Sequence, residues 1–302
     1  MSSIGDRAFI RCEKMTSAVI GNNVQKISAY MFYECNRLTT LVIPDSVTEI
    51  GACAFYNCDG LQSITIPDSV NYVGQSAFEY CDGLISVEIG NGVTKTGYTL
   101  FHKCSNLQGV TIGDGLTEIN TSTFYDCPSL TTVKLGKNVE KIGNYAFNNC
   151  YNLKTIVIPN SVTEIGENTF QHCHALKSII IPKSVASINA DAFSYCYRLK
   201  SITILNPECD IFDDALTISN GENSDYIPYF YGAIYGYENS TSSAYAENHG
   251  YNFDTWKVND IVSIQKYLVR LSADIPESYD INGDEIINIF DMIILKRLLI
   301  TL

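Results

Sequence analysis

The chain has 302 residues and a formal net charge of −13. A strongly acidic chain repels nucleic acid and anionic lipid through its long-range field, so neither is expected as a partner. No run of about 18 or more apolar residues occurs, so we expect no segment to insert into a membrane.

From residue 4 to residue 210 the sequence repeats itself with a period of 23 residues. Phenylalanine keeps this step, cysteine follows it by three residues, and leucine, or Met15 in the first copy, comes three residues later. The cysteines of the repeat stand at positions 12, 35, 58, 81, 104, 127, 150, 173 and 196. A unit of this length cannot bury its own apolar side chains, so the pattern predicts a solenoid whose stacked units share one core.

Each unit contains a short alternating segment, which in all but the last copy is followed by a proline or glycine, as in residues 61–66. Strict alternation predicts a β-strand, with Ile64 and Ile66 facing inward and the residues between them facing solvent. Val70, Ile50 and their equivalents are predicted to line the opposite wall. The segment from phenylalanine to cysteine is predicted to form a tight helical turn.

The unit resembles the bacterial BspA-like leucine-rich repeat, which places Ile-Gly, Ala-Phe, Cys, Leu and Ile-x-Ile-Pro at the same spacings. The resemblance implies a mainly β solenoid over residues 1–255, with about nine repeats in residues 4–210 and a cap in residues 211–255. In that cap, residues 234–251 match the helix and final strand that close such domains. Thr96 replaces the leading isoleucine in one unit, and Gly136 replaces the proline in another.

The resemblance further implies a surface or secreted module that binds partners and does not catalyse a reaction. We therefore expect an extracellular protein attached to a scaffold or to the cell surface. The first residues lack the pattern of a signal peptide, and we expect such a peptide to have been trimmed.

The column of equally spaced cysteines allows three interpretations, namely disulfides, a metal site or buried free thiols. Each cysteine has two equivalent neighbours, and paired ligands such as C-x-x-C do not occur. We therefore expect free thiols that act as small apolar side chains in the core. His172 and His174 flank one of them and are expected to face solvent. Cys53 and Cys209 lie outside the column and carry no assigned role.

A column of small side chains is predicted on the outward side of the strands. Its members are Ser17, Thr40, Ser63, Ser86, Gly109, Thr132, Thr155, Ser178 and Ser201. This column either binds a protein or a glycan, or only keeps an exposed sheet soluble and in register, and the two roles are compatible. The aromatic side chains between Tyr226 and Tyr237 are either sugar-stacking rings or, as we favour, part of the cap.

A different duplication, with an offset of 31 residues, begins at Val258. Residues 258–268 and 289–299 carry apolar side chains at helical spacing, which predicts two amphipathic helices packed on each other. Residues 280–291 have the oxygen-bearing pattern of a calcium loop, with Glu285 where such loops normally have glycine. The predicted ligands are Asp280, Asn282, Asp284, the carbonyl group of Ile286, Asn288 through water, and Asp291.

The duplicated loop and helix resemble a dockerin, the small all-α, EF-hand-like calcium-binding module that attaches extracellular proteins to cohesins of a cellulosomal scaffoldin. We assign this module to residues 256–302. The resemblance implies that the cohesin contacts are Ile289, Phe290, Lys296 and Arg297, with partial counterparts in Val258, Asn259, Gln265 and Lys266. Residues 249, 251 and 253 are not calcium ligands in type, so one Ca²⁺ is expected, bound to the second loop only.

Three functions remain as hypotheses. The leading one is a non-catalytic cellulosome-associated protein, in which the dockerin binds a scaffoldin cohesin through calcium and the solenoid binds another protein or a polysaccharide. The alternative is a cell-surface adhesin or inhibitor with a vestigial dockerin. An enzyme is disfavoured, because no nucleophile, base and orienting group recur outside the repeat positions.

Overall fold

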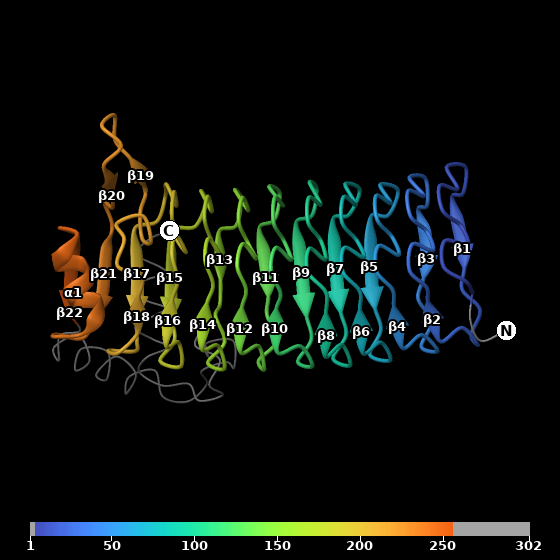
Figure 1. Ribbon diagram of the computed structural model, residues 1–302, viewed down its shortest axis with the longest axis horizontal. Coiled ribbons are helices and arrows are strands. Elements are labelled where there is room, and N and C mark those ends of the chain that lie inside the picture. The colour runs from blue at the N-terminus through green and yellow to red at the C-terminus, as the bar shows by residue number, and fades with distance from the viewer. Residues whose placement is uncertain (1–3, 256–302) are drawn as a thin grey trace, which may run out of the picture.

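The computed structural model describes residues 4–255, which wind into a solenoid of about ten turns (Figure 1). Each regular turn of 23 residues places one strand in a front row and a two-residue strand in a back row. Strands in a row pair in parallel, so that residues 23 positions apart face each other, as do Ser63 with Ser86 and Ile50 with Val73. The 23-residue period of the sequence therefore sets the register of strand pairing in both rows.

The front row consists of three sheets that follow one another along the rod. Its strands are β1 (Ser17–Val19), β3 (Thr40–Val42), β5 (Ser63–Ile66), β7 (Ser86–Ile89), β9 (Gly109–Ile112), β11 (Thr132–Lys134), β13 (Thr155–Ile156), β15 (Ser178–Ile181), β17 (Ser201–Ile204), β21 (Ala233–Gly236) and β22 (Asn252–Thr255). The back row consists of two sheets. Its strands are β2 (Lys26–Ile27), β4 (Glu49–Ile50), β6 (Tyr72–Val73), β8 (Lys95–Thr96), β10 (Glu118–Ile119), β12 (Lys141–Ile142), β14 (Glu164–Ile165), β16 (Ser187–Ile188) and β18 (Asp210–Ile211).

The core lies between the two rows and runs the length of the solenoid. In β5 the residues alternate between exposed and buried, and Ile64 and Ile66 point inward as predicted. Val70 and Ile50, which reach the core from the opposite wall, are fully buried. Because every turn repeats this arrangement, the apolar area that one turn leaves open is covered by the next.

The segment from phenylalanine to cysteine is not the predicted helical turn. In each copy one residue of this segment, such as Asn57 at 54°, and one residue just before it, such as Cys53 at 53°, have positive φ, and such residues interrupt a helix. Alternate N–H groups point along the rod instead: those of Cys53, Phe55 and Asn57 donate to carbonyl oxygens of the following turn at 2.8–2.9 Å. The stacked neighbour thus provides the backbone partners that a helix would have provided internally.

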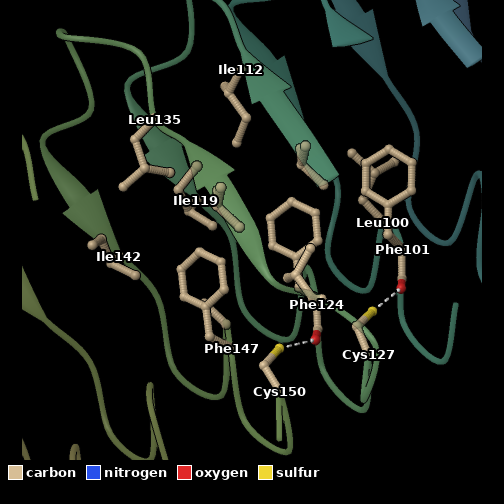
Figure 2. Packing of buried hydrophobic residues seen from close by; sticks show 14 of the residues in the cluster. Leu100, Phe101, Ile112, Ile119, Phe124, Cys127, Leu135, Ile142, Phe147 and Cys150 are labelled. Carbon is tan, nitrogen blue, oxygen red and sulfur yellow. Dashed lines mark hydrogen bonds between the residues drawn. The ribbon is translucent and has the colours of Figure 1, made fainter. Parts of the chain in front are cut away.

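The phenylalanines of this segment form one continuous stack through the core, from Phe9 to Phe193, and Figure 2 shows Phe101, Phe124 and Phe147 of it. Neighbouring rings, such as Phe101, Phe124 and Phe147, have centroids 5.3–5.6 Å apart and lie nearly parallel. From the second copy onward, each phenylalanine of the repeat is at most 2% exposed. The stack therefore joins successive turns to one another, in addition to the two rows of strands.

The last turns of the solenoid depart from the repeat and form the predicted cap. A hairpin of β19 (Gly221–Glu222) and β20 (Pro228–Tyr229) precedes β21 and projects beyond the line of the other turns (Figure 1). Helix α1 (Thr241–Asn248) begins at Ser240, whose side chain accepts a hydrogen bond from the Ser243 amide. The helix contacts β18, β21 and β22, so it covers the open end of the core. The helix expected within residues 234–251 is thus present, and the final strand, β22, begins just after that range at Asn252.

The predicted dockerin, residues 256–302, lies outside the described residues, as do the first three residues of the chain. Its bounds, its two helices and its calcium loop therefore remain predictions.

Candidate binding surface

The outward side of the front row, called here the front face, carries the predicted hydroxyl column. Its members pair directly across the ladder, as Ser63 does with Ser86 and Thr132 does with Thr155. Most are exposed, and Gly109, Ser178 and Ser201 are half-buried. The column therefore presents a regular line of short polar side chains on a row of strands.

Beside the hydroxyl column, two residues further along each strand, lies a mixed column of the front face. Val19 is 97% exposed, Val42 72% and Val157 53%, whereas the equivalent residues elsewhere include Glu88 and Lys134. Small soluble proteins expose single apolar residues routinely, so these valines alone do not define a site. Together with the hydroxyl column they make a long surface of mostly exposed side chains, which ends near β17, where Thr203 of the mixed column is buried.

The cysteine column consists of free thiols, as predicted. Cys53 and Cys209, outside the column, are free thiols as well. From Cys35 onward each thiol of the column also donates a hydrogen bond to the phenylalanine carbonyl of the preceding turn, at 3.0–3.3 Å. Figure 2 shows this for Cys127 and Phe101. Burial raises the pKa of the Cys127 and Cys196 thiols to about 12, which keeps the donor proton in place. The cysteines are therefore more than the apolar fillers that we predicted.

A line of aromatic rings runs along the outer edge of the turns. In the first half of the solenoid, neighbouring rings contact one another, with Tyr33 and Tyr56 stacked at 4.7 Å. The other contacts in this line involve Tyr30, Tyr80, His102, Tyr125 and Tyr145. Only the Tyr33–Tyr56 contact is stacked, and the others in this line are tilted or edge-to-face, so these rings pack on one another without forming a regular stack.

The second half of the solenoid has a tighter group of rings, called here the aromatic ridge and formed by Tyr151, His174 and Tyr197. The His174 ring stacks between the two tyrosines, with centroids 4.7 Å and 4.3 Å away. His172 stacks on Tyr195 at 4.9 Å. Both histidines are half-buried, so the prediction that they face solvent is wrong, and the reason is this stacking. Burial lowers the pKa of both imidazoles, which favours the neutral ring.

The cap hairpin is fixed next to the aromatic ridge. The Tyr195 hydroxyl donates to the Glu222 carboxylate at 2.6 Å, and this bond, with burial, raises the pKa of Tyr195 to about 12. Gly221, with φ of 144°, lies so close to Tyr197 that an added Cβ would be 3.3 Å from its ring. The hairpin then exposes Tyr231 (80%) and Tyr226 (82%), whereas Phe230 is buried in the cap. The aromatic cluster between Tyr226 and Tyr237 therefore serves the cap in part and is exposed in part.

The family of the chain follows from its repeat. The family described as "BspA type Leucine rich repeat region" matches in six copies, over residues 2–131 and 97–220. The chain belongs to the BspA-type leucine-rich-repeat family. This confirms the part of the sequence-based resemblance that concerns the solenoid.

The chain is also similar to solved structures of leucine-rich-repeat proteins. A leucine-rich repeat protein from Bacteroides ovatus ATCC 8483 is 31% identical, with a TM-score of 0.66 over 78% of this chain and 58% of its own. This BspA-type chain thus spans just over half of that protein's length. A leucine rich repeat protein from T. pallidum is 29% identical, with a TM-score of 0.47 over 50% of this chain and 71% of its own. A leucine rich cell surface protein from Faecalibacterium prausnitzii A2-165 is 27% identical, with a TM-score of 0.34, over 68% and 77%. No curated protein matches.

The predicted calcium ligands, from Asp280 to Asp291, and the predicted cohesin contacts, including Ile289 and Phe290, fall outside the described residues. Within residues 4–255, no group of three or more His, Cys, Asp or Glu residues is arranged to hold a metal ion. In the same range no helix has the length and apolar character needed to cross a membrane.

Two features of the BspA-type solenoid were not predicted from the sequence. The thiol donors cannot be recognised from a cysteine column, because the acceptor carbonyl lies 26 residues away in the chain. The aromatic ridge does leave a signal: the position after the cysteine holds Asp59 and Asp82 in early turns but Tyr151, His174 and Tyr197 in late ones. Comparing each repeat position along the rod would have revealed it.

Proposed function

We propose that this protein is a non-catalytic, extracellular interaction protein of a cellulosome. Its solenoid binds another protein or a polysaccharide through the front face, and its last residues, 256–302, form a dockerin that binds a scaffoldin cohesin with one Ca²⁺. The alternative is a cell-surface adhesin or inhibitor with a vestigial dockerin. Membership of the BspA-type leucine-rich-repeat family supports an interaction role at the cell surface.

The observation that carries the proposal for the solenoid is the front face itself. An array of parallel strands presents hydroxyl side chains and isolated exposed valines, and among residues 4–255 the only helix, α1, lies at the end of the rod. Extended, rigid repeat surfaces of this kind bind large partners because they need no reorganisation on binding.

Blocking the front face tests this proposal. The variant Thr132→Arg with Thr155→Arg places two long cations in the exposed hydroxyl column. The control, Thr117→Arg with Asn160→Arg, adds the same charge at exposed positions outside the front row. On a combined glycan and protein array, the partners of the full chain should be lost by the first variant and kept by the control. Equal binding by both variants would exclude the front face.

A panel of purified cohesins tests the dockerin. The full chain should bind at least one cohesin in the presence of Ca²⁺ and lose it in chelator, because carboxylate ligands shape the loop only around the ion. Asp280→Ala with Asp284→Ala should have the same effect as chelator. Absence of binding to every cohesin, with front-face binding intact, would favour the adhesin or inhibitor alternative.

A further inference from the structure

A lysine column runs beside the aromatic ridge in the second half of the solenoid. Lys154, Lys177 and Lys200 occupy the same position of three consecutive turns, three residues after Tyr151, His174 and Tyr197. Lys154 and Lys200 are exposed, and Lys177 is half-buried. The backbone amide of Lys200 donates to the carbonyl oxygen of Lys177 at 2.8 Å, so these two residues are immediate neighbours on the ladder.

This column is electrostatically unfavourable in the free protein. Neighbouring turns of a parallel ladder are about 4.8 Å apart, and like charges directly opposite each other on a sheet destabilise it. None of the three lysines forms an ion pair with a carboxylate in residues 4–255. The chain as a whole has a net charge of −13, so a local line of unpaired cations is not a consequence of composition.

The equivalent positions of earlier turns are different. Where the late turns have lysine, the early turns have Thr39, Gln62 and Ile85, and where the late turns have the aromatic ridge, two early turns have Asp59 and Asp82. At these two repeat positions the solenoid is therefore polarised along its length, with lysines and aromatic rings only in the late turns next to the cap hairpin.

Each of the three late turns presents the same trio of side chains. The trio is an aromatic ring, a lysine and the hydroxyl of the next residue, as in Tyr197, Lys200 and Ser201. The other two trios are Tyr151, Lys154 and Thr155, and His174, Lys177 and Ser178. A regularly repeated trio is complementary to a polymer in which each unit carries an anion, hydroxyl groups and a small apolar surface.

From this charge complementarity and repetition we infer that the three late turns bind an acidic polysaccharide of the polyuronate type, laid along the rod. The lysines neutralise successive carboxylates, the Ser and Thr hydroxyls hydrogen-bond to sugar hydroxyls, and the exposed part of the Tyr197 ring, which is 52% accessible, contacts a sugar ring. An acidic protein segment would use the lysines alone, whereas a uronic acid polymer also uses the hydroxyl groups and the exposed rings of Tyr151 and Tyr197. The inference rests on the proposed function, since it names the ligand of one part of the front face.

The test is a titration of the full chain with oligogalacturonides in calcium-free buffer. Binding should weaken as salt is added, because exposed charge pairs are screened. The variant Lys154→Gln, Lys177→Gln and Lys200→Gln should bind at least about tenfold more weakly, since three ion pairs with the ligand are lost together. The control Lys14→Gln, Lys95→Gln and Lys183→Gln removes three other exposed lysines and should bind like the parent chain.

Two comparison ligands decide the chemical class. Neutral gluco-oligosaccharides of the same length should bind much more weakly than oligogalacturonides, and so should oligoglutamate. Binding of oligoglutamate as tight as that of oligogalacturonide would overturn the inference in favour of an acidic protein, and so would unchanged oligogalacturonide binding by the triple variant. If the array finds a partner that depends on the front face but oligogalacturonides do not bind, the proposed function stands and this inference is wrong.

Discussion

At the scale of single residues, the cysteine column shows how the solenoid uses a neighbouring turn. The Cys127 thiol donates to the Phe101 carbonyl at 3.1 Å inside the core. Cys127→Ala should lower the free energy of unfolding by about 1–2 kcal/mol, because it removes this bond and leaves a small cavity. Denaturant unfolding followed by circular dichroism measures this change in the free energy of unfolding. Cys12 heads the column, with no such donation among the described residues, and is only half-buried, so Cys12→Ala should have a clearly smaller effect.

The half-buried histidines predict a dependence of stability on pH. Burial lowers the pKa of His172 and His174, so near pH 6 the unfolded chain binds protons more readily than the folded chain. Their contribution to stability is complete above the unfolded value of about 6.5 and is lost as pH falls through the lower folded values. The thermal midpoint should therefore be lower at pH 5.5 than at pH 7.5.

A double variant tests the origin of this pH dependence. His172→Gln with His174→Tyr removes both titrating groups and gives the ridge the tyrosine found at the same position in the turns on either side. The variant should show a smaller decrease in thermal midpoint between pH 7.5 and pH 5.5. An unchanged decrease would assign the effect to other groups.

At the scale of elements, the cap depends on a hydroxyl group in α1. The buried Tyr245 hydroxyl donates to the Asp214 carbonyl at 2.7 Å and accepts from the Ile218 amide at 3.2 Å. Tyr245→Phe leaves both groups unpaired and should destabilise the cap by about 1–3 kcal/mol. Hydrogen exchange of α1 amides should become faster, while exchange in the early turns stays the same. Tyr237→Phe, at a more exposed ring, should leave α1 protected.

At the scale of the whole molecule, stability is a property of neighbouring turns. Deleting residues 96–118 removes one whole turn and joins Lys95 to Ile119 in the register of the repeat. This variant should unfold cooperatively, with a free energy of unfolding reduced by roughly a tenth, as expected for the loss of one turn in about ten. Deleting residues 97–118 instead shifts the register by one residue, which turns core side chains outward, and should prevent a cooperative transition. Similar unfolding curves for the two deletions would contradict a register held by the stacked core.

The sequence by itself determined the solenoid, its 23-residue register, the inward columns such as Phe124 and Ile64, the outward hydroxyl column and the cap with its helix. All of these except the cap follow from patterns that are local and shared by the turns, so one turn is enough to predict them, whereas the cap was expected from the family resemblance. The tertiary structure decided the backbone of the turn segment, where Cys53 and Asn57 adopt positive φ, and the thiol bond from each cysteine to a carbonyl 26 residues earlier. It also decided that His174 stacks between Tyr151 and Tyr197. Each of these features depends on the side chains and carbonyl groups of the neighbouring turns. The sequence of one repeat does not contain that information.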